Sequence, residues 1–160
     1  MKHCVEEGEH KIYKEAYEML RLHFVYNSMN AIKYYIGREP ETASLMVSDL
    51  AVFLRGSVEN ALAEKMIPLS EELKFAHAYA ELEKFRSRKW SLLWQVNVSE
   101  GYVPSGCIYR CVEKFIKTYI LSAEEARTLC VTDMAGEAIR IQIRETKETE
   151  LIPICKMIDE

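Results

Sequence analysis

The stretch RLHFVYNSMNAI (Arg21–Ile32) places one histidine and two asparagines on a segment that otherwise has the spacing of a buried helix. Apolar residues recur around it at three- and four-residue steps, which predicts a helix over residues 9–36. His23 lies one helical turn before Asn27, and Asn30 follows three residues later, so all three share one side of that helix. Two interpretations are open at this point: a core histidine with amides beside it, or a chemical site.

A short turn follows this helix and predicts a helical hairpin. Gly37 and Pro40 bracket the turn, and Pro40 suits the first turn of a second helix over residues 40–62. One side of the second helix is apolar and carries Ala43, Met46, Leu50, Phe53 and Leu54. A turn this short makes the two helices antiparallel, and two helices alone cannot enclose a core. Pairing two hairpins into a four-helix bundle solves this problem, so we expect a homodimer.

The pattern changes after a linker over residues 63–68. Ser70 is the expected N-cap of a third helix that runs to Arg88, with Glu71 and Glu72 at its positive end. A regular apolar stripe predicts a fourth helix after Pro104.

Strands are expected between and after these helices. Residues 90–98 alternate in a way that predicts a half-buried strand. Three more strands are expected at 127–132, 138–145 and 151–158, as a small antiparallel meander. Pro153 makes the last of them an edge or bulged strand. The second half is therefore predicted to be an α+β layer.

Composition restricts the class of protein. The chain has 160 residues, a net charge of −4 and 49% hydrophobic residues, which is ordinary for a soluble globular protein. No basic cluster indicates nucleic-acid binding, and no apolar run reaches the roughly 20 residues that span a bilayer. We expect no signal peptide and no membrane span in this chain, although a membrane-anchored parent protein stays open.

The cysteines favour a reducing, cytoplasmic environment. They are an odd, scattered set without a CxxC pair, at Cys4, Cys107, Cys111, Cys130 and Cys155. Cys107 and Cys111 share a helical side, but no nearby histidine or cysteine completes a zinc set, so we expect no bound metal.

Three blocks of sequence resemble one family. LHFVYNSMNAIKYYI (22–36) is similar to the phosphoacceptor box of LytS-type sensor histidine kinases, with Leu22 where the family has proline. LAVFLRGSV (50–58) resembles the family's return-helix segment. IPLSEELKFAHAYAELEKFRSRKWSLLWQVNV (67–98) resembles its helix with the pattern Tyr-x-x-Leu-Glu-x-x-Arg, which leads into a strand.

The resemblance implies a phosphoryl relay. His23 matches the phosphorylated histidine, Asn27 the first asparagine of the box and Asn30 the second. A neutral imidazole is a good nucleophile near pH 7, and an amide at i+4 can hold the ring, a phosphoryl oxygen or a water. Catalysis of phosphoryl transfer is mostly positioning and electrostatics, so a receiver domain's aspartate and metal can supply the rest.

The ATP-binding half of such kinases is degenerate here. In the family's asparagine box, which corresponds to CVEKFIKTYI (111–120), Lys114 stands at the asparagine that ligates magnesium, Thr118 at the histidine and Tyr119 at the glycine. A protonated lysine cannot ligate a metal. Asp159 stands near the position of the adenine aspartate, but the six glycines form no GxG phosphate loop. We therefore expect no ATP and no other cofactor.

Together these patterns predict two domains. Residues 1–66 are expected to form a dimerising phosphoacceptor hairpin, and residues 67–160 a truncated, ATP-incompetent remnant of the GHKL (Bergerat) ATPase fold, an α/β sandwich. This architecture is similar to that of the sporulation phosphorelay phosphotransferase. The first functional hypothesis is a histidine phosphotransferase that exchanges phosphoryl groups with receiver-domain aspartates. The second is a pseudokinase that docks a receiver or a kinase without chemistry, and the third is a fragment of an active kinase.

Overall fold

The structure is a computed structural model that describes residues 21–59, 65–98 and 100–156. The chain divides into two compact units, Met1–Ser44 and Leu45–Glu160. The first unit contains a helix over residues 21–36 (hereafter the first helix), a turn at residues 37–39 and the start of α2 (Pro40–Glu59). The predicted end of the first helix before Gly37 and the predicted start at Pro40 are both confirmed. The predicted start near Glu9 lies outside the described residues.

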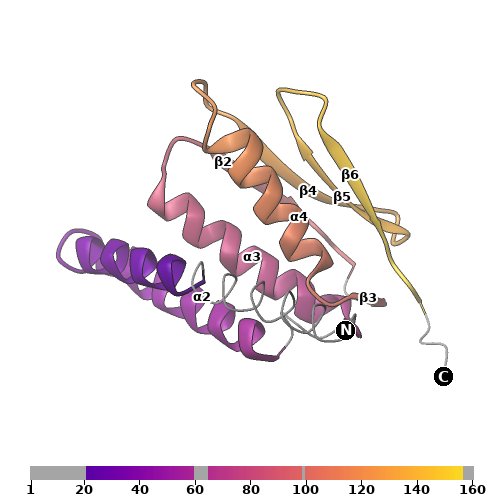
Figure 1. Cartoon of the computed structure of the whole chain (residues 1–160), viewed down its shortest axis with the longest axis horizontal. Helices are drawn as coiled ribbons and strands as arrows, with labels where there is room; N and C mark the ends of the chain where they lie inside the picture. The colour runs from indigo at the N-terminus through magenta and orange to yellow at the C-terminus, as the bar shows by residue number, and fades with distance from the viewer. Residues whose placement is uncertain (1–20, 60–64, 99, 157–160) are drawn as a thin grey trace, which may run out of the picture. The chain divides into compact units, whose positions relative to one another are not determined.

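The second unit is a mixed α+β structure (Figure 1). Its elements after α2 are, in order, β1 (Met66–Pro68), α3 (Leu69–Arg86), β2 (Ser91–Gln95), β3 (Tyr102–Pro104), α4 (Cys107–Phe115), the π-helical turn η1 (Ile116–Ile120), β4 (Thr128–Met134), β5 (Ala138–Ile143) and β6 (Thr149–Pro153). The α+β class predicted from the sequence is confirmed.

The main sheet has the strand order β2-β4-β5-β6. The three last strands form the predicted antiparallel meander, and Pro153 lies on the edge strand β6, as expected. β2 pairs with β4 in parallel, which requires the crossover through α4. In β5 every second side chain is buried: Ile139, Ile141 and Ile143. In β4 three consecutive residues are buried: Leu129, Cys130 and Val131.

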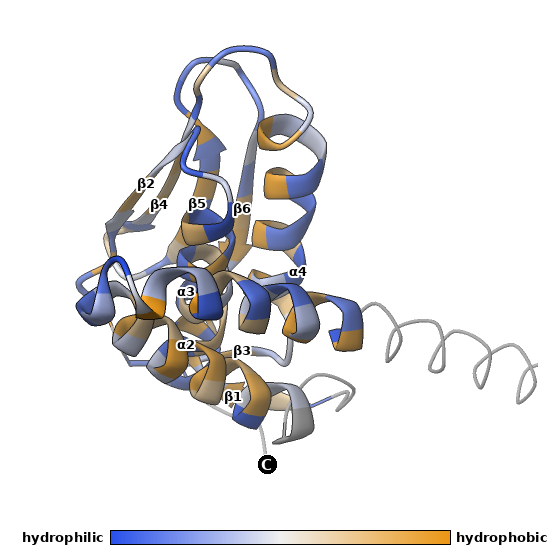
Figure 2. Cartoon of the chain, turned by 90° about the vertical axis from the view of Figure 1, so that its left-hand side faces the viewer, coloured by the Kyte–Doolittle hydropathy of each residue, from blue (hydrophilic) through white to orange (hydrophobic). Residues whose placement is uncertain are grey.

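Two helices, α3 and α4, lie together on one side of this sheet (Figure 1). In Figure 2 the apolar residues of α4 lie on one side of the helix and the polar residues on the other. α3 is different, because it is buried on most of its sides. Its alanines at positions 76, 78 and 80 are all buried, and such small side chains allow neighbouring elements to approach closely.

An aromatic cluster joins α2, α3 and α4 within the second unit. The rings of Phe53 and Phe75 are stacked with centroids 5.3 Å apart, and the ring of Tyr109 lies 4.5 Å from that of Phe75. Tyr79 completes the cluster at 5.1 Å from Tyr109. All four residues are buried, and such pairs contribute about 0.5–1.5 kcal/mol each beyond their burial.

Gly56 of α2 lies against this cluster, and we predict that Gly56→Ala destabilises the protein. A Cβ at this position would lie 2.5 Å from Cδ2 of Phe75. Overpacking of this kind costs about 1–3 kcal/mol, which exceeds the roughly 1 kcal/mol that alanine gains over glycine in a helix. Urea unfolding measures the change. Gly37→Ala is the matched control because a Cβ there meets nothing within 4 Å, and equal stability of the two variants would contradict the prediction.

Asp49 of α2 gives the stability a pH dependence. Burial, together with the nearby Glu81 carboxylate, raises the pKa of Asp49 from 3.8 to about 6. Since the folded state binds the proton more tightly, stability falls as pH rises from about 4 to about 6. Asp49→Asn, which stays neutral, is therefore expected to stabilise the protein at pH 7.5. The pKa shift alone corresponds to a gain in unfolding free energy of about 3 kcal/mol. Solvent screening of this half-buried group reduces the expected gain to roughly 1 kcal/mol.

Urea unfolding at pH 7.5 and pH 4 tests this expectation. The gain from Asp49→Asn should vanish at the lower pH, where the native aspartate is protonated too. The exposed Glu124→Gln is the control and should change stability little at either pH. A gain of equal size at both pH values would contradict the assigned cause.

Several local features differ from the sequence predictions. Ser70 is not the N-cap of α3, because the helix begins at Leu69 with Pro68 in the capping position and without a side-chain cap. The predicted strand over 90–98 is shorter, and α3 ends at Arg86 rather than Arg88. β1 and β3, which pair with each other, were not predicted. The π-helical turn η1 was not predicted either. The backbone N–H of Leu121, the residue after η1, donates a hydrogen bond to the carbonyl of Ile116.

Candidate functional site

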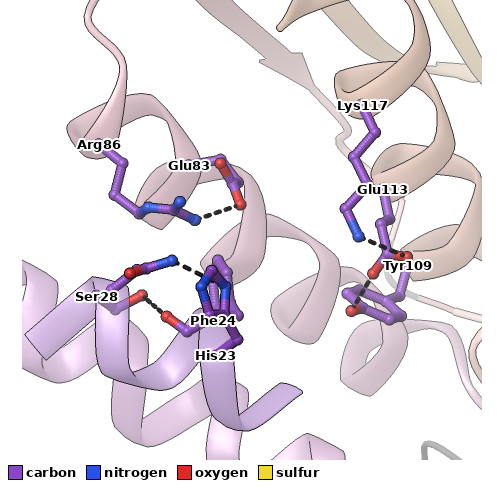
Figure 3. A network of polar contacts seen from close by, with 9 residues as sticks. His23, Phe24, Ser28, Glu83, Arg86, Tyr109, Glu113 and Lys117 are labelled. Carbon is purple, nitrogen blue, oxygen red and sulfur yellow. Dashed lines mark hydrogen bonds and ion pairs between the residues drawn. The ribbon is translucent and has the colours of Figure 1, made fainter. Parts of the chain in front are cut away.

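His23 lies on the first helix with its imidazole exposed to solvent. Its Nδ1 is 3.1 Å from the side-chain nitrogen Nδ2 of Asn27, one turn further along (Figure 3). The structure therefore brings these two predicted site residues together, with the histidine exposed. Asn30 is exposed on the same side of the helix, three residues beyond Asn27.

The hydrogen bond between Asn27 and His23 engages one ring nitrogen and leaves the other, Nε2, available. As drawn, Nδ2 donates to Nδ1, which requires the proton of a neutral ring to be on Nε2. Rotation of the amide by half a turn presents Oδ1 instead, and Nδ1–H then donates to it. In that arrangement Nε2 carries a lone pair and can act as a nucleophile.

The first helix has three distinct sides, which explains why the sequence is mostly apolar around a polar site. The buried side follows a helical period and consists of Phe24, Ser28, Ile32 and Tyr35. Ser28 is satisfied there because its hydroxyl donates to the carbonyl of Phe24 at 2.9 Å. The second side is apolar but exposed, and we call it the apolar side: Leu22, Tyr26, Met29 and Ile36.

The third side is the one that carries the site, and we call it the His23 side. It consists of His23, Asn27, Asn30 and Tyr34, spaced by four, three and four residues. The interpretation of His23 as a core residue is wrong, because His23 is exposed and does not lie on the buried side of the helix.

Lys114, on α4, forms an ion pair with a carboxylate of the neighbouring strand. Its Nζ lies 3.6 Å from Oε2 of Glu150 on β6. The same carboxylate oxygen lies 3.4 Å from the thiol of Cys111. An exposed ion pair of this kind contributes little to stability, but it engages both the ammonium group of Lys114 and the carboxylate of Glu150.

Two groups of polar contacts, one on α3 and one at the end of α4, were not predicted from the sequence (Figure 3). On α3, Arg86 Nη1 donates to Glu83 Oε1 at 2.8 Å. On α4, the hydroxyl of Tyr109 donates to Glu113, and Nζ of Lys117, in η1, lies 3.4 Å from the same carboxylate. Burial raises the pKa of Glu83, while Arg86 opposes the shift. The motif spacing of Tyr79, Glu83 and Arg86, which puts them on one side of α3, was the signal for the group on α3.

Glu72 is the second feature that sequence reasoning missed. Its buried carboxylate accepts hydrogen bonds from the backbone N–H groups of Gly106, Ile108 and Tyr109, each at 3.0 Å. The first residues of a helix have unsatisfied N–H groups, so Glu72 of α3 caps α4. Gly106 adopts a left-handed conformation, with φ of 77°, which glycine allows without strain. Burial raises the pKa of Glu72, and the three N–H donors oppose that shift.

Four of the five cysteines lie in the described part of the chain. No two of Cys107, Cys111, Cys130 and Cys155 are joined by a disulfide bond. Burial raises the pKa of Cys107 and of Cys111 to about 12, so both stay protonated at neutral pH. Among the described residues no group of three histidine, cysteine, aspartate or glutamate side chains is arranged to hold a metal ion. Asp159 lies outside the described residues.

Comparison with known proteins supports the family resemblance. Residues 14–90 match the family model described as histidine kinase. This chain is a relative of the LytS-type sensor histidine kinases. The family resemblance inferred from the three sequence blocks is therefore confirmed, and the chain is a histidine kinase-like protein of two-component signalling.

Three sensor kinases illustrate the relationship. Sensor histidine kinase BtsS of Escherichia coli is 32% identical over 103 residues, which cover 59% of this chain and 17% of that protein. Sensor protein LytS of Enterococcus faecalis is 29% identical over 127 residues, covering 74% and 21%. Sensor protein kinase HptS of Staphylococcus aureus is 25% identical over 157 residues, covering 95% and 25%. The chain thus spans a quarter or less of the length of these relatives.

Among solved structures, the histidine kinase domain of a blue-light activated kinase from Erythrobacter litoralis is similar over 76% of this chain and 69% of that chain, with 12% identity and a TM-score of 0.32. In the described part of this chain no helix is both long and apolar enough to cross a membrane.

Proposed function

We propose that this chain is a histidine phosphotransferase that relays phosphoryl groups between His23 and the aspartate of a response-regulator receiver domain. The observation that carries the proposal is the exposed His23 imidazole with Asn27 on its Nδ1. A phosphoacceptor must admit the phosphoryl group in line, and an exposed ring allows this. Asn30, on the same side, is proposed to contact a phosphoryl oxygen or the partner.

The transfer step follows from the chemistry of the pair. Nε2 of His23 attacks the phosphorus of the receiver's aspartyl phosphate, an N–P bond forms, and the P–O bond to the aspartate breaks. The aspartate leaves as a carboxylate. Nδ1 keeps its proton, and Oδ1 of Asn27 accepts that hydrogen bond, which stabilises the positive charge developing on the ring. The reverse reaction uses the same groups.

Transfer from phosphorylated receivers tests the proposal. Receiver domains carrying radiolabelled phosphate are mixed with the protein, and acid-labile label on this chain is measured. His23→Gln should abolish labelling, and His77→Gln, which removes the partly buried histidine of α3, should leave it intact. Labelling that survives His23→Gln, or that never appears with any receiver, would refute the phosphotransferase function.

The second candidate is a pseudokinase that docks a receiver or a kinase without being phosphorylated. Lys114 favours it, because by the resemblance it replaces the family's magnesium-binding asparagine, and its ammonium group is paired with Glu150. Leu22, which replaces the family's proline, also favours it. Binding of a receiver without label on His23 would support this candidate.

We also propose the domain division and the dimer inferred from the sequence: a hairpin over residues 1–66 that pairs as a four-helix bundle, and a degenerate ATPase-like domain over residues 67–160. The apolar side of the first helix supports the dimer, since Leu22, Tyr26 and Ile36 are 60–68% exposed. Light scattering at micromolar concentration should give about twice the 18.6 kDa chain mass. A monomer with native helix content would contradict this expectation.

A further inference from the structure

A cavity lies in the second unit where two connections of the chain meet. Residues 87–90, between α3 and β2, line one wall, and residues from 120 to 126, between η1 and β4, line the other. The connections meet because β2 and β4 are parallel neighbours, and the backbone N–H of Ser91 donates to the carbonyl of Arg127 at 3.0 Å. The cavity volume is about 460 Å³, within the range of roughly 300–1,000 Å³ that is typical of small-molecule sites. It shares no residue with the His23 side of the first helix.

Trp90 gives this cavity a hydrogen-bond donor without an acceptor. Its side chain is one of those that line the cavity, and the residue is only 5% exposed. The indole Nε1 is buried and has no hydrogen-bond partner among the described residues. An indole N–H can only donate, and a buried donor without an acceptor destabilises the fold. The wall that contains Trp90 therefore favours a ligand that brings an acceptor atom.

The two walls carry charges of opposite sign. Arg88 and Lys89 belong to the wall of Trp90, whereas Glu124 and Glu125 belong to the other, and all four residues are exposed. None of the ion pairs within the described ranges engages Lys89, Glu124 or Glu125. Hydrogen bonds to charged groups are the strong ones, so the first wall favours an anionic acceptor and the second a cationic donor.

Apolar groups make up most of the remaining lining. They are the ring of Trp90, the buried Ile120, the half-exposed Leu121 and the alanines at 123 and 126. A pocket with an apolar lining and a few charged groups binds the carbon skeleton of a ligand by burial and fixes its orientation through the polar contacts. The lining is thus complementary to a molecule with a carboxylate, an ammonium group and an apolar part.

We propose that this cavity binds a small zwitterion of the amino acid class. Lys89 and the indole N–H of Trp90 hold the carboxylate of the ligand, and Glu124 or Glu125 holds its ammonium group. Ile120, Leu121 and the indole ring cover the carbon skeleton. The binding site does not depend on the phosphotransfer proposed for His23, and it gives the second unit a ligand of its own.

Calorimetric titration of the whole chain tests the class of ligand. The probes are the twenty protein amino acids and the peptides Gly-Leu and Gly-Gly-Leu, in which the two charges lie further apart. At least one probe is expected to bind with a Kd below about 1 mM. The N-acetyl derivative and the methyl ester of that probe each lack one of its charges, and both should bind about tenfold more weakly or worse. Failure of every probe to bind, or equal binding of either derivative, would overturn the proposal.

Variants locate the binding in this cavity. Lys89→Ala and the double variant Glu124→Gln/Glu125→Gln are expected to raise the Kd of the tightest probe about tenfold or more. Lys74→Ala and Glu71→Gln are the matched controls, because they remove the same kinds of charge at exposed positions of α3 that do not line the cavity. Their Kd should change by less than about twofold. Wild-type affinity of the Lys89 variant or of the double variant would overturn the proposal.

The indole N–H of Trp90 gives a readout that does not depend on charge. The chain has two tryptophans, so a ¹⁵N-labelled sample shows two indole signals in NMR spectra, and Trp94→Phe assigns the one that belongs to Trp90. Saturation with the tightest probe should move the proton signal of Trp90 downfield by more than that of Trp94, because this N–H gains an acceptor. A Trp90 signal that stays in place at saturation would overturn the proposed site.

Discussion

Glu72→Ala is expected to destabilise the protein by roughly 3–5 kcal/mol, the largest effect of any single substitution proposed here. The variant leaves the backbone N–H groups of Gly106, Ile108 and Tyr109 buried without the acceptor they have now. Each unsatisfied buried donor costs about 1–3 kcal/mol, and part of this cost is offset because a buried charge is removed as well. Since the bonds join α3 to the start of α4, their loss should loosen the contact between these two helices.

Two further variants make this expectation specific. Glu72→Gln keeps one acceptor oxygen but turns an amide toward one of the N–H groups, so an intermediate loss of roughly 1–2 kcal/mol is expected. Glu71→Ala removes the neighbouring exposed carboxylate and should change stability by no more than about 0.5 kcal/mol. Urea unfolding followed by circular dichroism measures all three. If Glu72→Ala lies within 1 kcal/mol of Glu71→Ala, the capping role of Glu72 is wrong.

The second large effect that we expect is weak binding of ATP. By the resemblance of residues 111–120 to the family's asparagine box, Lys114 stands where the family has its magnesium ligand, and its ammonium group pairs with Glu150. An ammonium group donates hydrogen bonds and cannot ligate magnesium. The loop between β5 and β6, residues 144–148, contains no glycine, and the sequence has no GxG turn to wrap phosphates. We therefore expect affinity for Mg-ATP no better than millimolar, about −4 kcal/mol.

Calorimetric titration with Mg-ATP and a labelled-ATP autophosphorylation assay check this expectation. Lys114→Asn should not restore activity, because it supplies a metal ligand but no phosphate loop. Micromolar binding by the wild-type chain, or label on His23 from ATP alone, would show that the chain is a working kinase.

Local signals allowed much of the fold to be predicted. The glycine and proline around the turn at 37–39 fixed the helix boundary, and the alternating isoleucines of β5 predicted a strand over 138–145 that is observed at 138–143. β1 and β3 have three residues each, which is too short for an alternating pattern to be recognised. The parallel pairing of β2 with β4 depends on a crossover that local periodicity does not encode.

In the candidate site too, contacts within one helix could be predicted from the sequence and contacts between elements could not. His23 and Asn27 are four residues apart on one helix, so their contact follows from helical geometry. Glu72 meets the start of α4 across 34 to 37 residues of sequence, and only the packing of α3 against α4 brings them together. From the sequence, Glu72 was assigned to its own helix. Arg86, in the last turn of α3, pairs with the buried Glu83, and the sequence analysis did not predict this pair.

The most direct test of the central claim is to locate the phosphoryl group on the protein. The chain, with its histidines labelled with ¹⁵N, is phosphorylated by a receiver domain that carries aspartyl phosphate, and its imidazole resonances are recorded by NMR. The account predicts one phosphorylated ring, that of His23, with the phosphoryl group on Nε2 and a proton on Nδ1. Phosphate on another histidine, on Nδ1 of His23, or on no histidine with any receiver would contradict it.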